Sequence, residues 1–213
     1  MENVKDELQN IIIGDGQVGS SSKLKQVQNF LRRNACSGER SKEQKYLKSE
    51  EEKRLVKFAQ EESLFYTPEI SESLFISEGA EQRVFKLDDL HVVKLNGAIF
   101  YEHWLDYFNS LLIHNFFFKS TCYEFLGFKI MDKELYAVVK QRFILATEVT
   151  DLELVKLFLT YNGFRNTRNN DYESAQLGII FEDLHDENVL SSNGILYFID
   201  TVFYLRDDFS LKK

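Results

Sequence analysis

The spacing of hydrophobic and polar positions changes near residue 70 of the 213-residue chain. Upstream, residues 22–33 place apolar side chains at helical intervals, which predicts an amphipathic helix. Residues 43–63 mix charges of both signs around a thin apolar stripe, which predicts a long helix that lies on the main domain through that stripe. The stripe consists of Tyr46, Leu47, Leu55, Phe58 and Ala59. Polar segments at 14–22 and 34–44 are expected to be loops.

Downstream of residue 70 the pattern predicts short strands and one helix. Residues 74–96 read as three strands joined by tight bends, and residues 123–144 read as a β-hairpin that turns at Asp132 and Lys133. Between them, residues 98–118 predict a helix with a large apolar face. The side chains expected to point inward are Phe100, Trp104, Phe108, Leu111 and Leu112.

The last third of the chain predicts another helix and two final strands. Residues 150–163 form the helix, which Thr150 can cap and Gly163 can end. A polar stretch at 164–176 follows, and then strands at 177–181 and 195–200 on either side of a polar bend. The order of elements predicts an α+β fold.

Composition restricts the compartment and the partners. The formal net charge of −8 argues against nonspecific binding to a phosphate backbone, so no nucleic-acid partner is expected. Two cysteines in dissimilar surroundings suggest neither a disulfide framework nor a zinc site, so the cytoplasm is the expected compartment. The apolar run at 11–13 is too short for a signal peptide, and no stretch approaches the ~20 apolar residues of a membrane span.

Candidate chemistry gathers between residues 182 and 205. Asp183 stands five residues before Asn188 on the polar bend, and Asp200 follows Asn188 by twelve residues. A hairpin would bring the end of its second strand back beside the bend, where Asn188 and Asp200 could share Mg²⁺, a cation that takes oxygen ligands. The alternative is an ordinary hairpin whose polar residues only form the turn. An Asp between two apolar runs is costly without a ligand or partner, which favours the chemical interpretation.

This segment resembles the catalytic loop of the protein-kinase-like superfamily. The D-L-x-x-x-N pattern runs from Asp183 to Asn188, in the D-L-H form found in aminoglycoside phosphotransferases. The later metal-binding Asp of that superfamily is present as Asp200, followed by Thr201 where D-F-G is usual. The resemblance implies that Asp183 is the catalytic base and that Asn188 and Asp200 hold Mg²⁺. It also implies that His185 contacts a phosphate or the substrate.

The first strands resemble a kinase N-lobe. Lys94 falls on the expected third strand, where the superfamily places its phosphate-binding lysine. The loop before it keeps only Gly79 of the usual glycines and looks like the loops of small atypical kinases, such as the kinase subunit of the tRNA-threonylcarbamoyl complex. By this resemblance Gly79, Ala80 and Val84 contact the nucleotide, with a looser grip because fewer backbone N–H groups are free.

Two further parts of a nucleotide site follow from the same resemblance. The lysine is expected to pair with a carboxylate on the next helix, where Glu102 and Asp106 lie one turn apart, and Glu102 is favoured for reach. Residues 137–144 take the place of the hinge, so backbone groups there, including those of Val139 and Gln141, are expected to read the adenine edge.

Residues 70–205 as a whole look like the compact Ser/Thr/Tyr kinase domain of polyvalent proteins, which are carried by bacterial phages and conjugative elements. The fold implied is a minimal kinase-like one: a helical extension at 1–65, a β-rich N-lobe with one helix at 66–145, and a truncated C-lobe at 146–213. The chain continues for only thirteen residues after Asp200, so the extension or a partner protein is expected to complete the platform for the substrate.

The expected activity is transfer of a phosphoryl group from ATP, with Mg²⁺ as cofactor, to a hydroxyl of an unknown protein or small molecule. Two alternatives remain. One is a pseudokinase-like module that binds nucleotide or another protein, which the short C-lobe favours. The other is transfer of AMP on the same fold. The presence of Lys94, Asp183 and Asp200 together favours the kinase.

Overall fold

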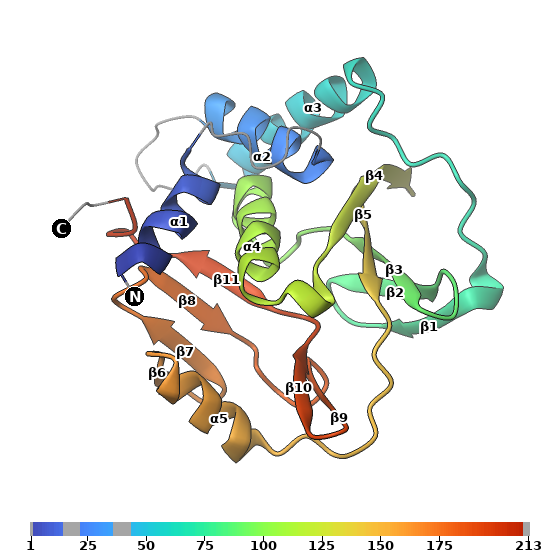
Figure 1. Cartoon of the computed structure of the whole chain (residues 1–213). Coiled ribbons are helices and arrows are strands. Elements are labelled where there is room, and N and C mark those ends of the chain that lie inside the picture. The colour runs from blue at the N-terminus through green and yellow to red at the C-terminus, as the bar shows by residue number, and fades with distance from the viewer. Residues whose placement is uncertain (1, 15–21, 36–43, 211–213) are drawn as a thin grey trace. The chain divides into compact units, whose positions relative to one another are not determined.

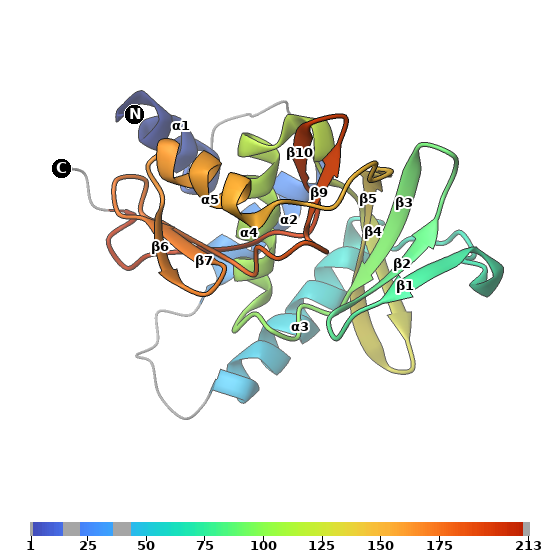
Figure 2. The same ribbon diagram turned by 90° about the horizontal axis from the view of Figure 1, so that it is seen from below.

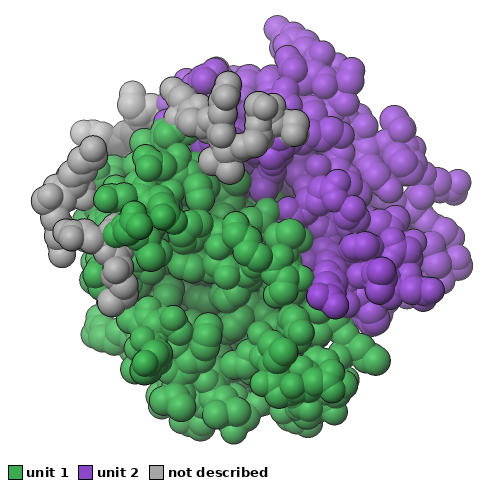
Figure 3. Space-filling model, in the orientation of Figure 1, with its two compact units in different colours: residues 1–17, 109–122, 144–213 green, residues 18–108, 123–143 purple. Residues whose placement is uncertain are grey.

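The computed structural model describes residues 2–14, 22–35 and 44–210, leaving out the side chains of Glu2 and of residues 44–47. The chain forms two compact units, shown in green and purple in Figure 3. Unit 1 contains residues 1–17, 109–122 and 144–213, and unit 2 contains residues 18–108 and 123–143. Residues 22–35 and 44–65, which the sequence sets apart as an extension, therefore group with the strands of unit 2.

Unit 2 is built on a five-stranded antiparallel sheet in the order β1-β2-β3-β5-β4 (Figure 1). Its strands are β1 (Phe75–Glu78), β2 (Gln82–Lys86), β3 (His91–Asn96), β4 (Glu124–Met131) and β5 (Glu134–Arg142), with a short 3-10 helix η1 (Glu72–Leu74) before β1. The three strands and the later hairpin predicted from the sequence are confirmed. The hairpin turns at Asp132 and Lys133, whose φ angles of 51° and 71° suit a tight turn between twisted strands.

Two helices of unit 2 precede the sheet: α2 (Lys23–Asn34) and α3 (Gln44–Glu61). Both match the helical spacing of the sequence. Leu55 and Ala59 of the predicted stripe are fully buried, and the ring of Phe58 stacks on Phe30 of α2 with centroids 4.0 Å apart. Contacts also join α2 to β4, so α2 and α3 are part of the packing of this unit.

The helix α4 (Trp104–Phe117) begins later than the sequence predicts. Trp104 and Phe108 are fully buried as expected, and their rings lie 6.1 Å and 5.9 Å from that of Phe128. The prediction that Phe100 points inward is wrong, because the chain bends before α4 and leaves this side chain 61% exposed.

Unit 1 contains a four-stranded sheet in the order β11-β8-β7-β6 (Figure 1) and a separate β9-β10 hairpin (Figure 2). Its strands are β6 (Arg165–Arg168), β7 (Asp171–Ser174), β8 (Ile179–Glu182), β9 (Val189–Ser192), β10 (Ile195–Phe198) and β11 (Val202–Leu205). Its other elements are the helices α1 (Glu2–Ile12) and α5 (Leu152–Tyr161) and the 3-10 helix η2 (Lys119–Thr121). Both views show α5 beside β6, and contacts join the two.

Three local expectations for unit 1 are corrected. The polar stretch 164–176 forms the hairpin of β6 and β7. The predicted final strands do not pair across the polar bend, because β8 pairs with β11, whereas β10 pairs with β9 around Asn193 and Gly194. Asp151, not Thr150, caps α5: its carboxylate accepts from Glu153 N, while the Thr150 hydroxyl donates to Val189 O at 2.6 Å. The predicted helix end is confirmed by Gly163, with φ of 81°.

Stacked phenylalanines form much of the core of unit 1. The ring of Phe181 in β8 lies 4.1 Å from that of Phe203 in β11, and Phe118 stacks on Phe198 at 4.4 Å. The helix α1 joins this unit through Gln9, whose side chain donates to Phe209 O. The fold is therefore a mixed α+β one with antiparallel sheets, as predicted. In the described part of the chain, no helix has both the length and the apolar character that crossing a membrane requires.

Candidate functional site

Asp183 lies directly after β8, in a backbone conformation that the surrounding loop fixes. Its φ of 64° is left-handed, a region that Asp tolerates better than most residues with side chains. Its N–H donates to Asp171 Oδ1 at 3.1 Å, and the next N–H, of Leu184, donates to Asn170 O at 3.2 Å. Strained backbone of this kind is common at active sites, where neighbouring groups hold it in place.

The side chains of Asp183, His185 and Asn188 come together within this loop. Asn188 Nδ2 donates to Asp183 Oδ2 at 2.9 Å and to Asp183 O at 2.8 Å. His185 Nε2 lies 3.4 Å from Asp183 Oδ1. The Asp183 side chain is nevertheless 59% exposed. It is an oriented carboxylate that remains accessible to a hydroxyl group.

The loop concentrates negative charge. Burial raises the pKa of Glu182 above its usual value, and the neighbouring carboxylates of Asp171 and Asp183 raise it further. A site with this charge suits a bound cation. Asp171 could not be identified from the sequence, because it lies in the polar stretch that forms β6 and β7 in the structure.

Asn188 and Asp200 are joined through the main chain, at the open end of the β9-β10 hairpin. The Asn188 carbonyl accepts from Ile199 N at 3.0 Å and from Asp200 N at 3.4 Å, directly beyond the Val189–Phe198 pair. The expected proximity of the two residues is therefore found, although the hairpin that creates it is not the one predicted. Because Asn188 Nδ2 is directed at Asp183, the amide oxygen faces another way.

These donors fit Mg²⁺ by chemistry, since carboxylate and amide oxygens are the ligands it prefers, with waters and phosphate oxygens completing its shell. Within the described ranges, no three His, Cys, Asp or Glu side chains form a group that could hold a metal ion. A pair of one Asp and one Asn is typical of protein ligands to Mg²⁺ that is held together with a nucleotide.

In unit 2, Lys94 is a buried lysine, with 3% of its surface exposed. It pairs with Val84 of β2 on one side and with Val139 of β5 on the other, so these three predicted residues form a row on one face of the sheet. The Lys94 ammonium lies 5.6 Å from the centroid of the Tyr123 ring. The opposite face carries the apolar cluster of Phe85, Val93, Leu95 and Val138.

The loop between β1 and β2 carries Gly79 and Ala80, both exposed. Gly79 N donates to Gln82 O at 2.9 Å, which closes the turn. A Cβ at Gly79 would meet no atom within 4 Å, and its φ is not positive. Neither packing nor backbone conformation within the protein therefore requires glycine at this position.

The expected carboxylate partners of Lys94 do not share one helical face. Glu102 lies in the bend before α4, exposed and 3.8 Å from His103 Nε2. Asp106 lies in the first turn of α4, where its Oδ2 accepts from His103 N at 3.2 Å. Burial raises the pKa of Asp106, and the nearby His103 opposes that shift. The expectation that both stand on the helix is wrong, because α4 begins at Trp104.

The two residues expected at the hinge both lie in β5. Val139 pairs with Lys94 of β3 and with Phe125 of β4, so the sheet uses its backbone groups, and the expectation that they could read a base is wrong. Gln141 pairs with Val92 of β3 and lies beyond Lys140, the last residue of β5 that β4 pairs with.

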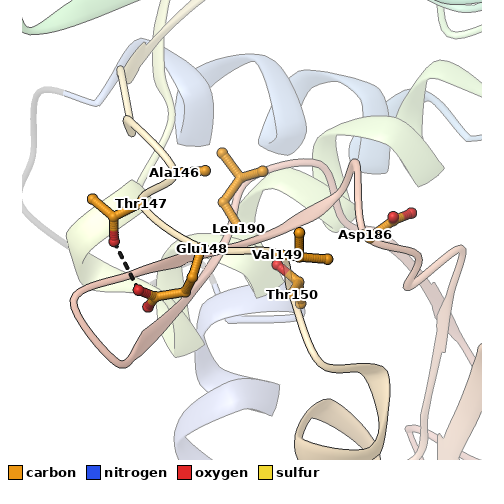
Figure 4. Close-up of a pocket in the computed structure, with 7 residues that line it drawn as sticks. All are labelled: Ala146, Thr147, Glu148, Val149, Thr150, Asp186 and Leu190. Carbon is orange, nitrogen blue, oxygen red and sulfur yellow. Dashed lines mark hydrogen bonds between the residues drawn. The ribbon is translucent and has the colours of Figure 1, made fainter.

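Unit 1 contains a pocket of about 470 Å³ beside the loop that carries Asp183 and Asn188 (Figure 4). Its lining is Ala146, Thr147, Glu148, Val149, Thr150, Asp186 and Leu190. Figure 4 shows Asp186 at one end, on the strand-connecting loop that also carries Asp183. Thr147 Oγ1 donates to Glu148 Oε2 at 2.9 Å, and Gly194 N donates to Glu148 Oε1 at 2.7 Å, which fixes the polar rim. The sequence did not indicate this pocket, because its residues come from separate segments.

Comparison with known proteins identifies the family of the chain. The searches among curated proteins and among solved structures found no match. The family model described as "Serine/Threonine/Tyrosine Kinase found in polyvalent proteins" matches residues 48–207, which begin within α3 and end just after β11. The chain therefore belongs to this family of Ser/Thr/Tyr kinases found in polyvalent proteins.

Proposed function

We propose that the protein transfers the γ-phosphoryl group of ATP to a hydroxyl group, with Asp183 as the base that orients that hydroxyl. The observation that carries this is the connected set in unit 1: Asn188 donates to the Asp183 carboxylate and holds Asp200 through its own carbonyl. Transfer of a phosphoryl group depends mainly on positioning and on charge stabilisation, and a set of this kind supplies both.

Asn188 Oδ1 and the Asp200 carboxylate would hold Mg²⁺. The ion neutralises charge that develops on the phosphoryl group as it is transferred. His185, 3.4 Å from the Asp183 carboxylate, is suited to donate to a phosphate or to the acceptor. Asp183 itself is exposed, so an acceptor hydroxyl can reach it.

Unit 2 would contribute the residues that bind the nucleotide. Lys94 is assigned to the phosphates, and its burial strengthens the interaction of its ammonium with an anion. Gly79 and Ala80 are assigned to the phosphate loop, because nothing within the protein explains the glycine while a closely approaching ligand would. Val84 shares the face of Lys94 and would contact the nucleotide. Glu102 stays the carboxylate proposed to act on Lys94, because the lysine near Asp106 is Lys48.

The adenine is assigned to the backbone at and beyond Gln141, where β4 no longer pairs with β5. By this assignment the five-stranded sheet of unit 2 is a kinase-like N-lobe and unit 1 a shortened C-lobe. The acceptor is a protein or small molecule of the cytoplasm, and a partner protein would complete its binding platform.

Formation of ADP from ATP·Mg²⁺ tests this function. Asp183→Asn is expected to lower turnover by about 10²–10⁴-fold, the usual contribution of a positioned acid or base. It should keep the rise in melting temperature that ATP·Mg²⁺ causes in the wild type. Glu187→Gln is the matched control, because it removes one exposed negative charge from the same loop and should keep turnover.

Two outcomes would contradict the assignment. Turnover by Asp183→Asn at the wild-type rate would remove Asp183 from the chemistry. A wild type that ATP·Mg²⁺ stabilises, but that forms no ADP with any acceptor supplied, would instead be a module that binds nucleotide without turning it over.

A further inference from the structure

We propose that His114 of α4 is a positioning residue, which holds the metal-binding Asp200 in place through a buried hydrogen bond to Thr201. This inference rests on the proposed function of Asp200. It concerns the residue that follows the proposed metal ligand and the part of α4 from residue 109 onward, which both belong to unit 1.

His114 is fully buried and is hydrogen-bonded at both ring nitrogens. Its Nε2 lies 2.8 Å from Thr121 O, and because a carbonyl oxygen can only accept, Nε2 carries the proton. Its Nδ1 lies 2.8 Å from Thr201 Oγ1, so in the neutral ring it accepts from the Thr201 hydroxyl. The bond to Thr121 thus fixes the orientation of the ring that holds Thr201.

Ser110 adds a second attachment one turn earlier on α4. Its hydroxyl accepts from Phe203 N at 3.0 Å and donates to Thr201 O at 3.4 Å. Ser110 and His114 are four residues apart, so they lie on the same helical face. Together they attach the side chain and carbonyl of Thr201 and the amide of Phe203 to one rigid helix.

The chain before Asp200 is also fixed. Asn188 O accepts from Ile199 N at 3.0 Å, and the hydroxyl of buried Thr121 donates to Phe198 O at 2.7 Å. Asp200 therefore lies between two anchored segments, with Asn188 on one side and α4 on the other. Residues outside a metal site that orient its ligands typically change metal affinity by about 10–100-fold when they are altered.

The choice of residue at position 201 explains why the hydrogen bond is needed. Thr201 is buried, but it has too little apolar surface to be held by packing alone. A buried hydroxyl also requires a partner, and His114 supplies it. A directional hydrogen bond to α4 thus holds the residue next to Asp200.

The test uses three variants and two measurements. Thr201→Val removes the hydroxyl and keeps the shape, Thr201→Ser keeps the hydroxyl, and Ser174→Ala removes a buried hydroxyl of β7 that lies outside this network. Circular dichroism confirms that each variant is folded. Hydrogen exchange of the backbone amides at 199–203 measures the anchoring without any ligand. Electron paramagnetic resonance measures the binding of Mn²⁺ with a non-hydrolysable ATP analogue.

We expect Thr201→Val to exchange these amides faster than the wild type and to bind Mn²⁺ about tenfold more weakly, as residues outside a metal site do when they orient its ligands. Thr201→Ser should restore both properties, and Ser174→Ala should keep the affinity for Mn²⁺. Unchanged exchange in Thr201→Val would overturn the anchoring, whatever the protein binds. Faster exchange with unchanged Mn²⁺ affinity, or an equal loss of affinity in Ser174→Ala, would overturn the role of His114 in positioning Asp200. A wild type that takes up no Mn²⁺ with the analogue would overturn the proposed function and this role with it.

Discussion

The start of α4 offers the sharpest test of how residues 44–61 contribute to unit 2. The first N–H groups of a helix have no partner within the helix. In α4, the carboxylate of Glu51 in α3 supplies one: its Oε2 accepts from Trp104 N at 2.8 Å and its Oε1 from Leu105 N at 3.4 Å. Lys48, one turn earlier, donates to Ala98 O and Tyr101 O at 2.6 and 2.7 Å. The helix that the sequence treats as an extension therefore caps α4.

Replacing Glu51 by Ala leaves two buried N–H groups without their acceptor. Loss of a helix cap costs about 0.5–2 kcal/mol, and a hydrogen bond to a charged group contributes about 1.5–3 kcal/mol. The second contact is long, so we expect Glu51→Ala to lower the free energy of unfolding by about 2 kcal/mol. For a chain of this size, that corresponds to a fall of about 4–8 °C in melting temperature.

Urea unfolding followed by circular dichroism measures this change. Glu50→Ala is the matched control, because the carboxylate of Glu50 pairs with Lys53 at the surface, at 2.7 Å and within the same helix. Such surface pairs add little to stability. If Glu50→Ala and Glu51→Ala shift the unfolding midpoint equally, Glu51 does not act as the cap of α4 and the reasoning is refuted.

Three further predictions concern Glu51, Lys94 and Phe181. Burial raises the pKa of Glu51 above 4.5, although the N–H of Trp104 opposes this shift. The stability linked to this group is therefore complete below about pH 4.5 and is lost as pH rises through the raised pKa. Glu51→Gln should flatten the decline of the urea midpoint above pH 4.5, and an unchanged slope would contradict this. Lys94→Met keeps the buried stem and removes the charge, so the variant should fold normally. It should lose the rise in melting temperature that ATP·Mg²⁺ gives the wild type. A rise as large as that of the wild type would exclude Lys94 from nucleotide binding. Phe181→Ala should lower the free energy of unfolding by about 3–5 kcal/mol, because Phe181 is 1% exposed and stacks on Phe203. Phe100→Ala, at a side chain that is 61% exposed, should change the free energy of unfolding little. Equal losses in the two variants would show that the core is misassigned.

Much of the candidate loop could be predicted because its information is local. The spacing of Asp183, Asn188 and Asp200 can be read from a short segment, whichever strands pair. It brings the three residues together provided that a turn returns the chain to the loop that carries Asp183. The predicted hairpin was nevertheless the wrong one. The strand β8 could pair with either of the two later apolar runs, and only long-range packing of Phe181 against Phe203 distinguishes them.

The features that were missed lack a local hydrophobic signal. All four residues of β6 are exposed, so this strand shows no apolar alternation, and its pairing with β7 comes from backbone contacts. The bend that removes Glu102 and Phe100 from α4 depends on capping by Glu51, which lies about fifty residues away in the chain. Similarly, the hydrogen bond between His114 and Thr201 could not be predicted from the sequence alone. Helical spacing indicates only that position 114 is buried, and it does not indicate which distant residue the histidine contacts.

We propose that the γ-phosphoryl group of ATP, and not its AMP part, is transferred to a hydroxyl. Parallel incubations with α-labelled and γ-labelled ATP and Mg²⁺ distinguish the two, with a mixture of Ser-, Thr- and Tyr-containing peptides and the protein itself as acceptors. We predict covalent label from γ-labelled ATP only, lost in Asp183→Asn and Asp200→Asn and retained in Glu187→Gln. Label from α-labelled ATP would show transfer of AMP instead, and equal γ-label in the wild type and both Asp variants would contradict the assigned site.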